Sequence, residues 1–290
     1  MPNPVLRPGP VERVRARFAA LAGAESARAL PRGFQRLGAA VLVRLPESLR
    51  AWYPRLGALY AEELRASQVL RVAGPVQGAW RLPAVERLAG DSGPVLVREN
   101  GVRFRLDPER VMFAAGNRTE RRRAGEVTRP GETVVDLFAG VGYFAIPSAV
   151  YGRPARVFAC EENPASFAYL CENARLNSVE DRLRPLLGDN RSAAIPLGAA
   201  DRIFLGWLPS AIPFLPRALE LLRPSGGYLH VHTLQGTREP LDAAEEEVGR
   251  GVLAAGGRVR TSRAREVKPY GPGRRHVVVD VHAVPSAVTA

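Results

Sequence analysis

Short apolar runs alternate with segments of helical spacing through the last two thirds of the chain. The apolar runs, which predict strands, are Thr133 to Leu137, Arg156 to Ala159, Leu183 to Leu187, Arg202 to Leu205, Gly227 to His232 and Val277 to Val281. The apolar spacing predicts helices over Pro164 to Asn177 and Glu239 to Ala255. Alternation of strand and helix is typical of a largely parallel, doubly wound sheet, in which ligands bind at the carboxyl ends of the strands.

The first hundred residues have a less regular pattern. The predicted elements there are a helix at Val11 to Phe18, a strand at Gly38 to Leu45, a helix at Leu56 to Leu64 and a strand at Val69 to Val72. We therefore predict a small N-terminal α+β domain over residues 1–100 and an α/β domain over residues 101–290.

The stretch Val134 to Phe144 reads as a buried strand that ends on Asp136 and runs into a glycine-rich turn. Gly140 and Gly142 would let the backbone N–H groups of this turn come close to a ligand. The third glycine of the dinucleotide-binding pattern does not follow. In this form the turn resembles the first motif of S-adenosylmethionine-binding transferases.

Acidic and amide side chains follow the next two predicted strands. Glu161 ends the second strand and can accept hydrogen bonds from both hydroxyls of a ribose; its neighbour Glu162 reads as a solvated turn residue. After the third strand, Asp189 can accept from an adenine amino group, and Asn190 can pair with a ring nitrogen or with its own backbone. An ordinary Asx turn is the alternative for this pair.

The fourth predicted strand leads into Trp207, Pro209 and Ser210, where an acceptor substrate should lie. Base-methylating relatives of such transferases carry Asn or Asp where this chain has Trp207. The indole either stacks on the acceptor or packs over the sheet. Further along, His230 and His232 are candidate general bases, and the alternative is that they are buried strand residues.

Upstream of the glycine turn, the stretch Val111 to Arg121 could fold over a bound ligand. Arg121 could then pair with a carboxylate, such as that of a methionine moiety. The equal alternative is a solvated arginine at the head of a basic run.

Composition adds only a little to what the motifs indicate about partner, compartment and metal. The 290-residue chain has a net charge of +12, which favours a polyanionic partner such as nucleic acid. However, Lys268 is the only lysine, and abundant Arg, Ala, Gly and Pro together also arise from GC-rich coding. No run of apolar residues is long enough for a membrane span, and Met1 to Pro4 do not begin a signal peptide. With two cysteines that lack metal-ligand spacing, we expect a cytoplasmic protein without a metal.

Taken together, the motifs resemble the wybutosine-synthesis 3-amino-3-carboxypropyltransferases, which are siblings of the tRNA guanine-N1 methyltransferases. The similarity runs from about Leu30 to His282. The stretches that carry it are Met112 to Arg121, Asp136 to Phe144, Glu161 to Pro164, Gly188 to Arg191 and Leu205 to Ser210, with Glu99 to Gly101 and Val267 to Tyr270 also fitting.

The resemblance implies a Rossmann-like, class I S-adenosylmethionine-dependent transferase fold. It also implies that S-adenosylmethionine binds through Ala114, Arg121, Glu161, Asp189 and Asn190. Ala114 replaces the usual serine of the family, so only its backbone could serve there. Asp136 could orient the amino group of the donor through a water molecule. The implied reaction is attack on Cγ of the methionine moiety, with release of methylthioadenosine and no need of a metal.

The acceptor stays open at the level of sequence. The arginine-rich composition suggests a GC-rich bacterium, where the wybutosine pathway is not expected, and so favours a phenolic small molecule in antibiotic biosynthesis, as for isonocardicin synthase. The alternatives are a tricyclic guanosine derivative beside the anticodon of phenylalanine tRNA, or tRNA guanine-N1 methylation. A non-enzymatic RNA-binding module is a third class of function, which the complete set of ligand motifs disfavours.

Overall fold

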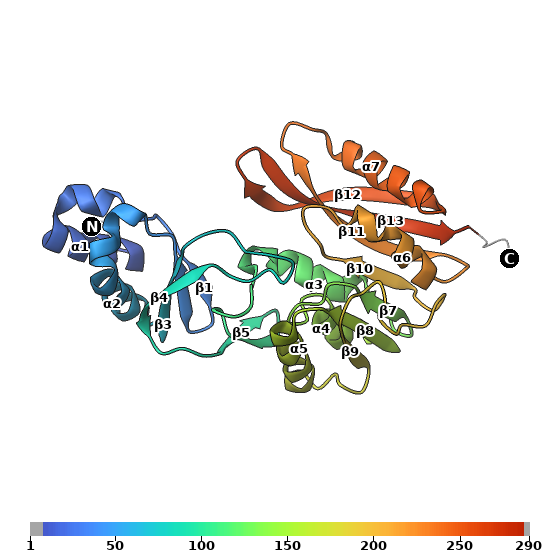
Figure 1. The fold of residues 1–290 in the computed structure, drawn as a ribbon, viewed down its shortest axis with the longest axis horizontal. Helices are drawn as coiled ribbons and strands as arrows, with labels where there is room; N and C mark the ends of the chain where they lie inside the picture. Colours follow the sequence, from blue (N-terminus) through green and yellow to red (C-terminus); the bar gives the residue numbers. More distant parts are fainter. Residues whose placement is uncertain (1–7, 287–290) are drawn as a thin grey trace, which may run out of the picture. The chain divides into compact units, whose positions relative to one another are not determined.

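The computed structural model describes residues 8–286, so the predicted lack of a signal peptide at Met1 to Pro4 lies outside the described residues. The chain divides into two compact units (Figure 1). The first unit consists of the residues up to Arg98 together with Arg105–Ala115, and the second consists of Glu99–Phe104 and the residues from Gly116 onward. The two units alternate along the sequence here, since residues 99–104 belong to the second and residues 105–115 to the first. The domain boundary predicted at residue 100 stays a prediction.

The first unit is a four-stranded sheet with two helices. Its elements are α1 (Pro10–Arg28), β1 (Gln35–Leu37), β2 (Ala40–Val43), the 3-10 helix η1 (Glu47–Trp52), α2 (Tyr53–Leu64), β3 (Gln68–Val72) and β4 (Val85–Gly90). The strand order is β1-β2-β3-β4, in which β2 and β3 are parallel and the outer pairs are antiparallel. Phe18 of α1 and Leu56 of α2 are fully buried in the core that these helices share with the sheet.

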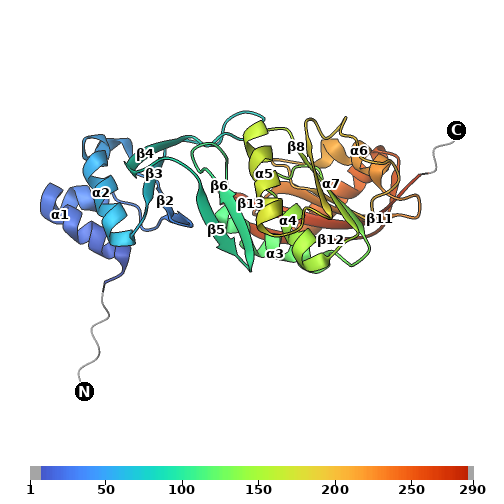
Figure 2. The same cartoon turned by 90° about the horizontal axis from the view of Figure 1, so that it is seen from below.

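A short hairpin follows, formed by β5 (Val95–Glu99) and β6 (Val102–Leu106) (Figure 2). Its two-residue turn is Asn100-Gly101, and both residues have positive φ angles, of 49° and 76°. Asn-Gly is the preferred sequence for such a turn, because both residues tolerate the left-handed backbone that matches the twist of the strands.

The second unit is built on a seven-stranded sheet. Its strands are β7 (Thr133–Asp136), β8 (Arg156–Glu161), β9 (Leu183–Leu187), β10 (Arg202–Leu205), β11 (Gly227–Gly236), β12 (Gly257–Gly271) and β13 (Arg274–Pro285), in the order β12-β13-β11-β10-β7-β8-β9. The five strands from β11 to β9 are parallel to one another, and β13 is antiparallel to both of its neighbours. The largely parallel sheet predicted from the alternating pattern is therefore present, with an antiparallel edge.

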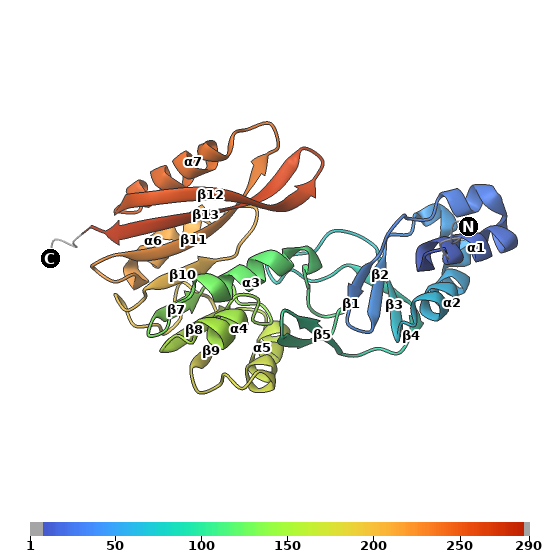
Figure 3. The same ribbon diagram turned by 180° about the vertical axis from the view of Figure 1, so that it is seen from behind.

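Helices cover both faces of this sheet. They are α3 (Arg118–Val127), α4 (Ala145–Pro147) continued by a π-helical turn η3 (Ser148–Gly152), α5 (Pro164–Leu176), α6 (Leu215–Leu221) and α7 (Leu241–Ala254), with 3-10 turns η2 (Ala115–Asn117) and η4 (Ile212–Phe214). Val279 and Val281 of β13 share a core with α6 and α7, whereas Asp280 between them bonds to Arg123 of α3. Successive strand residues point to opposite faces, so α3 lies on the face opposite α6 and α7 (Figures 1 and 3).

The strands and helices predicted from the apolar pattern are all present, with ends that differ by a few residues, except that α1 continues ten residues beyond the predicted end at Phe18. The helix α3 and the edge strand β12 carry so many charged residues that their apolar spacing gave no prediction. Both cysteines, Cys160 and Cys171, are free. Within residues 8–286, no helix is long and apolar enough to cross a membrane. The cytoplasmic location stays a prediction.

Candidate functional site

The glycine turn after β7 has the tight backbone that its sequence predicts. Gly140 and Gly142 have φ angles of 56° and 104°, in the left-handed region that favours glycine. A Cβ on Gly140 would come within 2.3 Å of the Tyr143 ring, and one on Gly142 within 2.3 Å of Ile146 Cγ1. Both positions therefore require glycine for two reasons, the backbone angle and the close packing.

Asp136 holds this turn together from inside. It is fully buried, and its carboxylate accepts hydrogen bonds from the backbone N–H groups of Phe138 (3.2 Å) and Ala145 (3.1 Å). Burial raises the pKa of this carboxyl group to about 7, although hydrogen bonds from the backbone of Phe138, Ala145 and Phe144 act in the opposite direction. The side chain shapes the turn that a ligand would contact, and the water-mediated contact predicted for it stays a prediction.

Glu161 is the last residue of β8 and faces the same turn. Its Oε2 accepts from the N–H of Gly140 (2.7 Å), and its Oε1 accepts from the N–H of Asn163 (2.8 Å). Burial raises the pKa of Glu161, whereas Glu162 is exposed, as the sequence predicts. The backbone of Glu162 also hydrogen-bonds to this carboxylate, which still has lone-pair capacity for a further donor, such as a ribose hydroxyl.

Asn190 presents an unsatisfied acceptor at the next strand end. Its Nδ2 donates to the carbonyl of Leu137 (3.0 Å), while its buried Oδ1 has no hydrogen-bond partner among residues 8–286. A buried acceptor without a partner is costly, so this atom is suited to a ligand donor such as the adenine amino group. Asp189 forms the Asx turn that the sequence left open, since its Oδ1 accepts from the N–H of Arg191 (2.9 Å). The guanidinium of Arg191 also lowers the pKa of Asp189.

Three aromatic side chains gather beyond β10. The rings of Trp207 and Phe138 lie 5.2 Å apart, and Phe214 packs edge-on to Phe138 at 4.7 Å. Trp207 is half-buried, so both packing and acceptor stacking fit its surroundings. Pro209 follows a cis peptide bond and its carbonyl accepts from the N–H of Leu234 (2.8 Å), while the hydroxyl of Ser210 accepts from the N–H of Ile212 (3.3 Å).

Arg121 is paired within the protein. Only 2% of the residue is exposed, its Nη2 lies 2.6 Å from Glu99 Oε2, and its guanidinium lies 5.9 Å from the centre of the Tyr143 ring. The interpretation of Arg121 as a solvated arginine is wrong, because the hairpin β5–β6 supplies Glu99 to it. Ala114 belongs to the first unit, and its contact with a donor stays a prediction.

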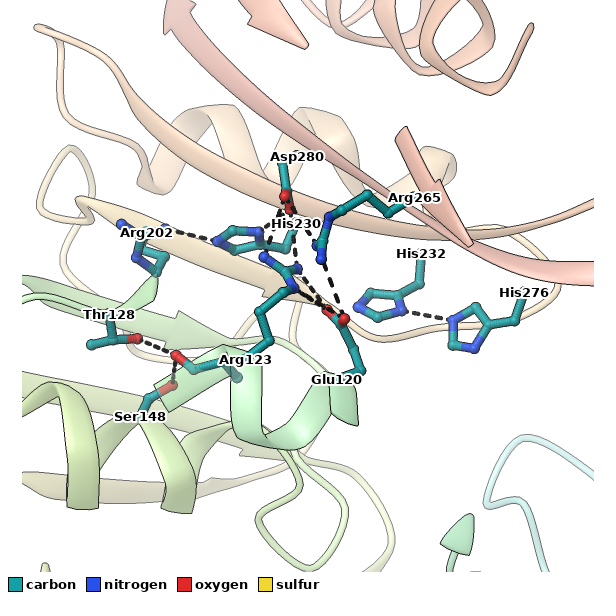
Figure 4. A network of polar contacts seen from close by, with 11 residues as sticks. Glu120, Arg123, Thr128, Ser148, Arg202, His230, His232, Arg265, His276 and Asp280 are labelled. Atoms are coloured by element: carbon teal, nitrogen blue, oxygen red, sulfur yellow. Dashed lines mark hydrogen bonds and ion pairs between the residues drawn. The ribbon is translucent and has the colours of Figure 1, made fainter. Parts of the chain in front are cut away.

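His230 sits within a buried ionic network, shown in Figure 4. Its Nδ1 lies 2.5 Å from Asp280 Oδ1, and its Nε2 lies 2.8 Å from Arg202 Nη1. Since an arginine can only donate, Nε2 is the acceptor and Nδ1 carries the proton. Burial lowers the pKa of His230, and its one basic nitrogen is already engaged.

His232 forms a second buried pair, with His276. The two rings are joined by a hydrogen bond of 2.7 Å between Nδ1 of His232 and Nε2 of His276 (Figure 4). Burial lowers the pKa of each to about 3, so both are neutral at physiological pH. His230 and His232 are at most 2% exposed, which favours the buried-residue interpretation over the role of a general base.

The glycine turn, Glu161, Asn190 and Trp207 thus lie at one edge of the sheet, where β7, β8, β9 and β10 end. Sequence reasoning assigned no role to Glu99, Phe214 or Lys268, because none of them lies at a predicted strand end. It also assigned no role to Phe138, although that residue directly follows one. Within residues 8–286 no cluster of His, Cys, Asp and Glu is suited to hold a metal ion. This fold and the acceptors at its strand ends define a class I S-adenosylmethionine-dependent transferase.

Comparison with known proteins identifies the family. Residues 95–250 match the TRM5/TYW2 methyltransferase domain, and residues 14–93 match the TYW2 N-terminal domain. The tRNA(Phe) (4-demethylwyosine(37)-C(7)) aminocarboxypropyltransferase of Pyrococcus horikoshii is 35% identical over 90% of this chain and 93% of its own length. The chain therefore belongs to the TRM5/TYW2 family, and within it to the TYW2 type.

Two solved structures extend the comparison. The crystal structure of P. horikoshii TYW2 in complex with MeSAdo has a TM-score of 0.83 and 32% identity, and covers 95% of this chain and all of that one. The structure of M. jannaschii TYW2 in complex with AdoMet has a TM-score of 0.70 and 29% identity, and covers 87% of this chain and all of that one.

Comparison with these relatives tests several of the predictions made from the sequence. The Rossmann-like transferase fold and the assignment to S-adenosylmethionine-dependent aminocarboxypropyltransferases are confirmed. The further resemblance to isonocardicin synthase, and with it a phenolic acceptor in antibiotic biosynthesis, finds no support among them.

Proposed function

We propose that this protein transfers the 3-amino-3-carboxypropyl group of S-adenosylmethionine to C7 of 4-demethylwyosine at position 37 of phenylalanine tRNA. The tRNA alternative thus replaces the phenolic acceptor that composition favoured. A relative that matches over nearly the whole of both chains is named for this reaction. The structural observation that carries the proposal is the buried, unpartnered Oδ1 of Asn190 at the sheet edge where Glu161 faces the glycine turn.

The donor would lie along the carboxyl ends of the parallel strands, and a different loop would contact each part of it. The carboxylate of Glu161 would accept from the ribose hydroxyls, and Oδ1 of Asn190 would accept from the adenine amino group. The backbone of the glycine turn, with Gly140 and Gly142, would line the sulfonium side of the donor. Asp189 is committed to Arg191 in this structure and would need to turn toward the ligand to contact it.

In the reaction, C7 of the acceptor would attack Cγ of the methionine moiety. The new C7–Cγ bond forms as the Cγ–S bond breaks, the sulfur keeps the bonding electron pair, and neutral methylthioadenosine leaves. C7 then releases its proton. The sulfonium activates all three attached carbons, so the protein's main task is to choose which carbon faces the acceptor.

The aromatic cluster of Phe138, Trp207 and Phe214 is suited to the acceptor. A tricyclic guanosine derivative is a large flat ring system, and unstacked RNA bases are commonly held by stacking on aromatic side chains. These three side chains lie at the end of β10, beside the glycine turn that would hold the donor. Trp207 also occupies the position where base-methylating relatives carry Asn or Asp. This difference favours transfer of the aminocarboxypropyl group over methylation of guanine N1.

The test offers the protein S-adenosylmethionine with three acceptors: tRNA(Phe) that carries 4-demethylwyosine, the same tRNA with guanosine at position 37, and a phenolic β-lactam. We expect an aminocarboxypropyl adduct on the first acceptor alone, with one methylthioadenosine released for each adduct, measured by mass spectrometry of the nucleosides.

The other outcomes are equally informative. An adduct on the phenol would reinstate the small-molecule acceptor, and a methyl group on guanosine with release of S-adenosylhomocysteine would assign the methylating reaction. Absence of product with every acceptor, despite measurable binding of the donor, would overturn the assigned acceptor.

A further inference from the structure

Lys268, the only lysine in the chain, occupies an unusual position near the carboxyl end of β12. Its side chain is half-buried, and among residues 8–286 no carboxylate lies within ion-pair distance of it. Lysines at the protein surface need no partner, because water solvates the ammonium group. A partly buried ammonium group without an acidic partner is costly, so its retention here calls for an explanation.

Three groups recorded near Lys268 are small, neutral or cationic: Gly116, His276 and Arg121. A Cβ on Gly116 would lie 3.1 Å from Lys268 Cδ and 3.2 Å from its Nζ, so glycine at this position leaves room for the lysine side chain. His276, its register partner on β13, is held neutral by burial. The pKa of Lys268 is lowered, first by burial and then by the positive charge of Arg121.

The charges of Lys268, Arg121 and Glu99 do not cancel. Arg121 and Lys268 bring two positive charges, and Glu99 brings one negative charge, which is already paired with Arg121 at 2.6 Å. One positive charge therefore remains for an anion that is absent from the protein itself.

Lys268 lies on the same carboxyl-terminal side of the sheet as the donor site, although β13, β11 and β10 stand between its strand and β7. β12 is antiparallel to β13, which is antiparallel to β11, so β12 runs in the same direction as the parallel strands and ends at the same edge. Arg121 lies between Lys268 and the glycine turn. Its positive charge acts on Lys268, its guanidinium lies 5.9 Å from the centre of the Tyr143 ring, and that ring packs on Gly140.

We propose that the ammonium group of Lys268 binds the carboxylate of the methionine moiety of S-adenosylmethionine, an inference that rests on the proposed function. Arg121 was the sequence-based candidate for this carboxylate, but Glu99 already neutralises it. The carboxylate is three bonds from Cγ, so anchoring it fixes the direction in which Cγ faces the acceptor. Lys268 would thereby favour aminocarboxypropyl transfer over attack on the methyl carbon.

The experiment compares three ligands by isothermal titration calorimetry: S-adenosylmethionine, decarboxylated S-adenosylmethionine and methylthioadenosine. The variants are Lys268→Gln, which removes the charge, and Arg263→Gln, which removes an exposed charge from the same strand as a matched control. We expect Lys268→Gln to weaken binding of S-adenosylmethionine about ten- to hundredfold and to leave the two ligands without a carboxylate unchanged within about twofold. Arg263→Gln should leave all three unchanged.

Three results would overturn the inference. If Lys268→Gln weakens all three ligands alike, the side chain has a structural role. If it weakens none of them but weakens binding of tRNA, the anion is an RNA phosphate. If the unsubstituted protein binds S-adenosylmethionine no more tightly than the decarboxylated compound, no cation holds the carboxylate, and this measurement needs no variant. If the unsubstituted protein does not bind S-adenosylmethionine at all, the proposed function itself fails.

Discussion

At the scale of single residues, the polar groups at the strand ends are already oriented before any ligand binds. Glu161 is fixed by the N–H groups of Gly140 and Asn163, and Asn190 is fixed by the carbonyl of Leu137. Each keeps an acceptor lone pair that no protein group uses. Such preorganisation lowers the cost of ordering side chains when a nucleoside binds.

Glu161 provides the most direct residue-scale prediction. In Glu161→Gln an amide N–H₂ group replaces one carboxylate oxygen. One hydrogen-bond donor, either a ribose hydroxyl or a backbone N–H group, then loses its acceptor. We expect the dissociation constant for S-adenosylmethionine and for methylthioadenosine to rise about ten- to hundredfold together, by calorimetry. The exposed neighbour provides the control, because Glu162→Gln should change neither by more than about twofold. Equal effects of the two substitutions would mean that Glu161 does not contact the ribose.

At the scale of elements, α3 is held on the sheet by buried charges. Arg123 of α3 lies between Glu120 of the same helix (2.6 Å) and Asp280 of β13 (3.1 Å), and Arg265 of β12 also reaches Asp280 (Figure 4). The sheet face beneath α3 therefore carries charged side chains beside apolar ones such as Val278, and directional ion pairs join α3 to it. This arrangement fixes Arg121, two residues earlier on the same helix, beside the glycine turn.

The strength of this attachment can be measured with two adjacent arginines. Arg123→Met would leave Glu120 and Asp280 buried with fewer positive partners, and we expect the free energy of unfolding to fall by about 3 kcal/mol or more. Arg122→Met removes an exposed pair with Glu126, and we expect a change below about 1 kcal/mol. Urea unfolding followed by circular dichroism measures both. A loss for Arg123→Met no larger than for Arg122→Met would show that apolar packing alone positions α3.

At the scale of the whole molecule, buried titratable groups make stability depend on pH in opposing directions. His232 and His276 have pKa values of about 3 in the folded protein, below the ordinary value of 6.5. The unfolded chain thus binds more protons between pH 3 and 6.5, and stability falls as the pH drops below 6.5. Asp136, with its pKa raised to about 7, is protonated more readily in the folded protein, so its contribution has the opposite sign between about pH 4 and 7.

The histidine contribution can be separated by a single substitution. His276→Gln removes one titrating group and leaves Asp136 in place. We expect the free energy of unfolding of the variant to depend less steeply on pH between 6 and 4, by roughly 1.4 kcal/mol per pH unit. Urea titrations at pH 7.5, 6, 5 and 4 give both slopes. Parallel curves for the two proteins would show that His276 is protonated in the folded state.

Local signals in the sequence were enough to identify the strands of the sheet and the glycine turn. A buried strand needs a continuous apolar run, and the left-handed backbone after β7 needs glycine at positions 140 and 142, so both features can be recognised within a dozen residues. Glu161 and Asn190 were recognised for the same reason, because each directly follows a strand and parallel strands end at a common edge. Their hydrogen-bond partners in the turn were not predicted.

Which charges distant in sequence come together depends on the folded chain as a whole. Glu99 of the hairpin reaches Arg121, Asp280 reaches Arg123 across more than 150 residues of sequence, and the antiparallel edge brings Lys268 to the carboxyl ends of the parallel strands. The electrostatic field of a side chain depends on its position in space and on its burial, and neither is fixed by local spacing. For this reason the sequence indicated the nucleoside site, whereas the buried state of the histidines and the unbalanced charge beside Lys268 became visible only in the folded chain.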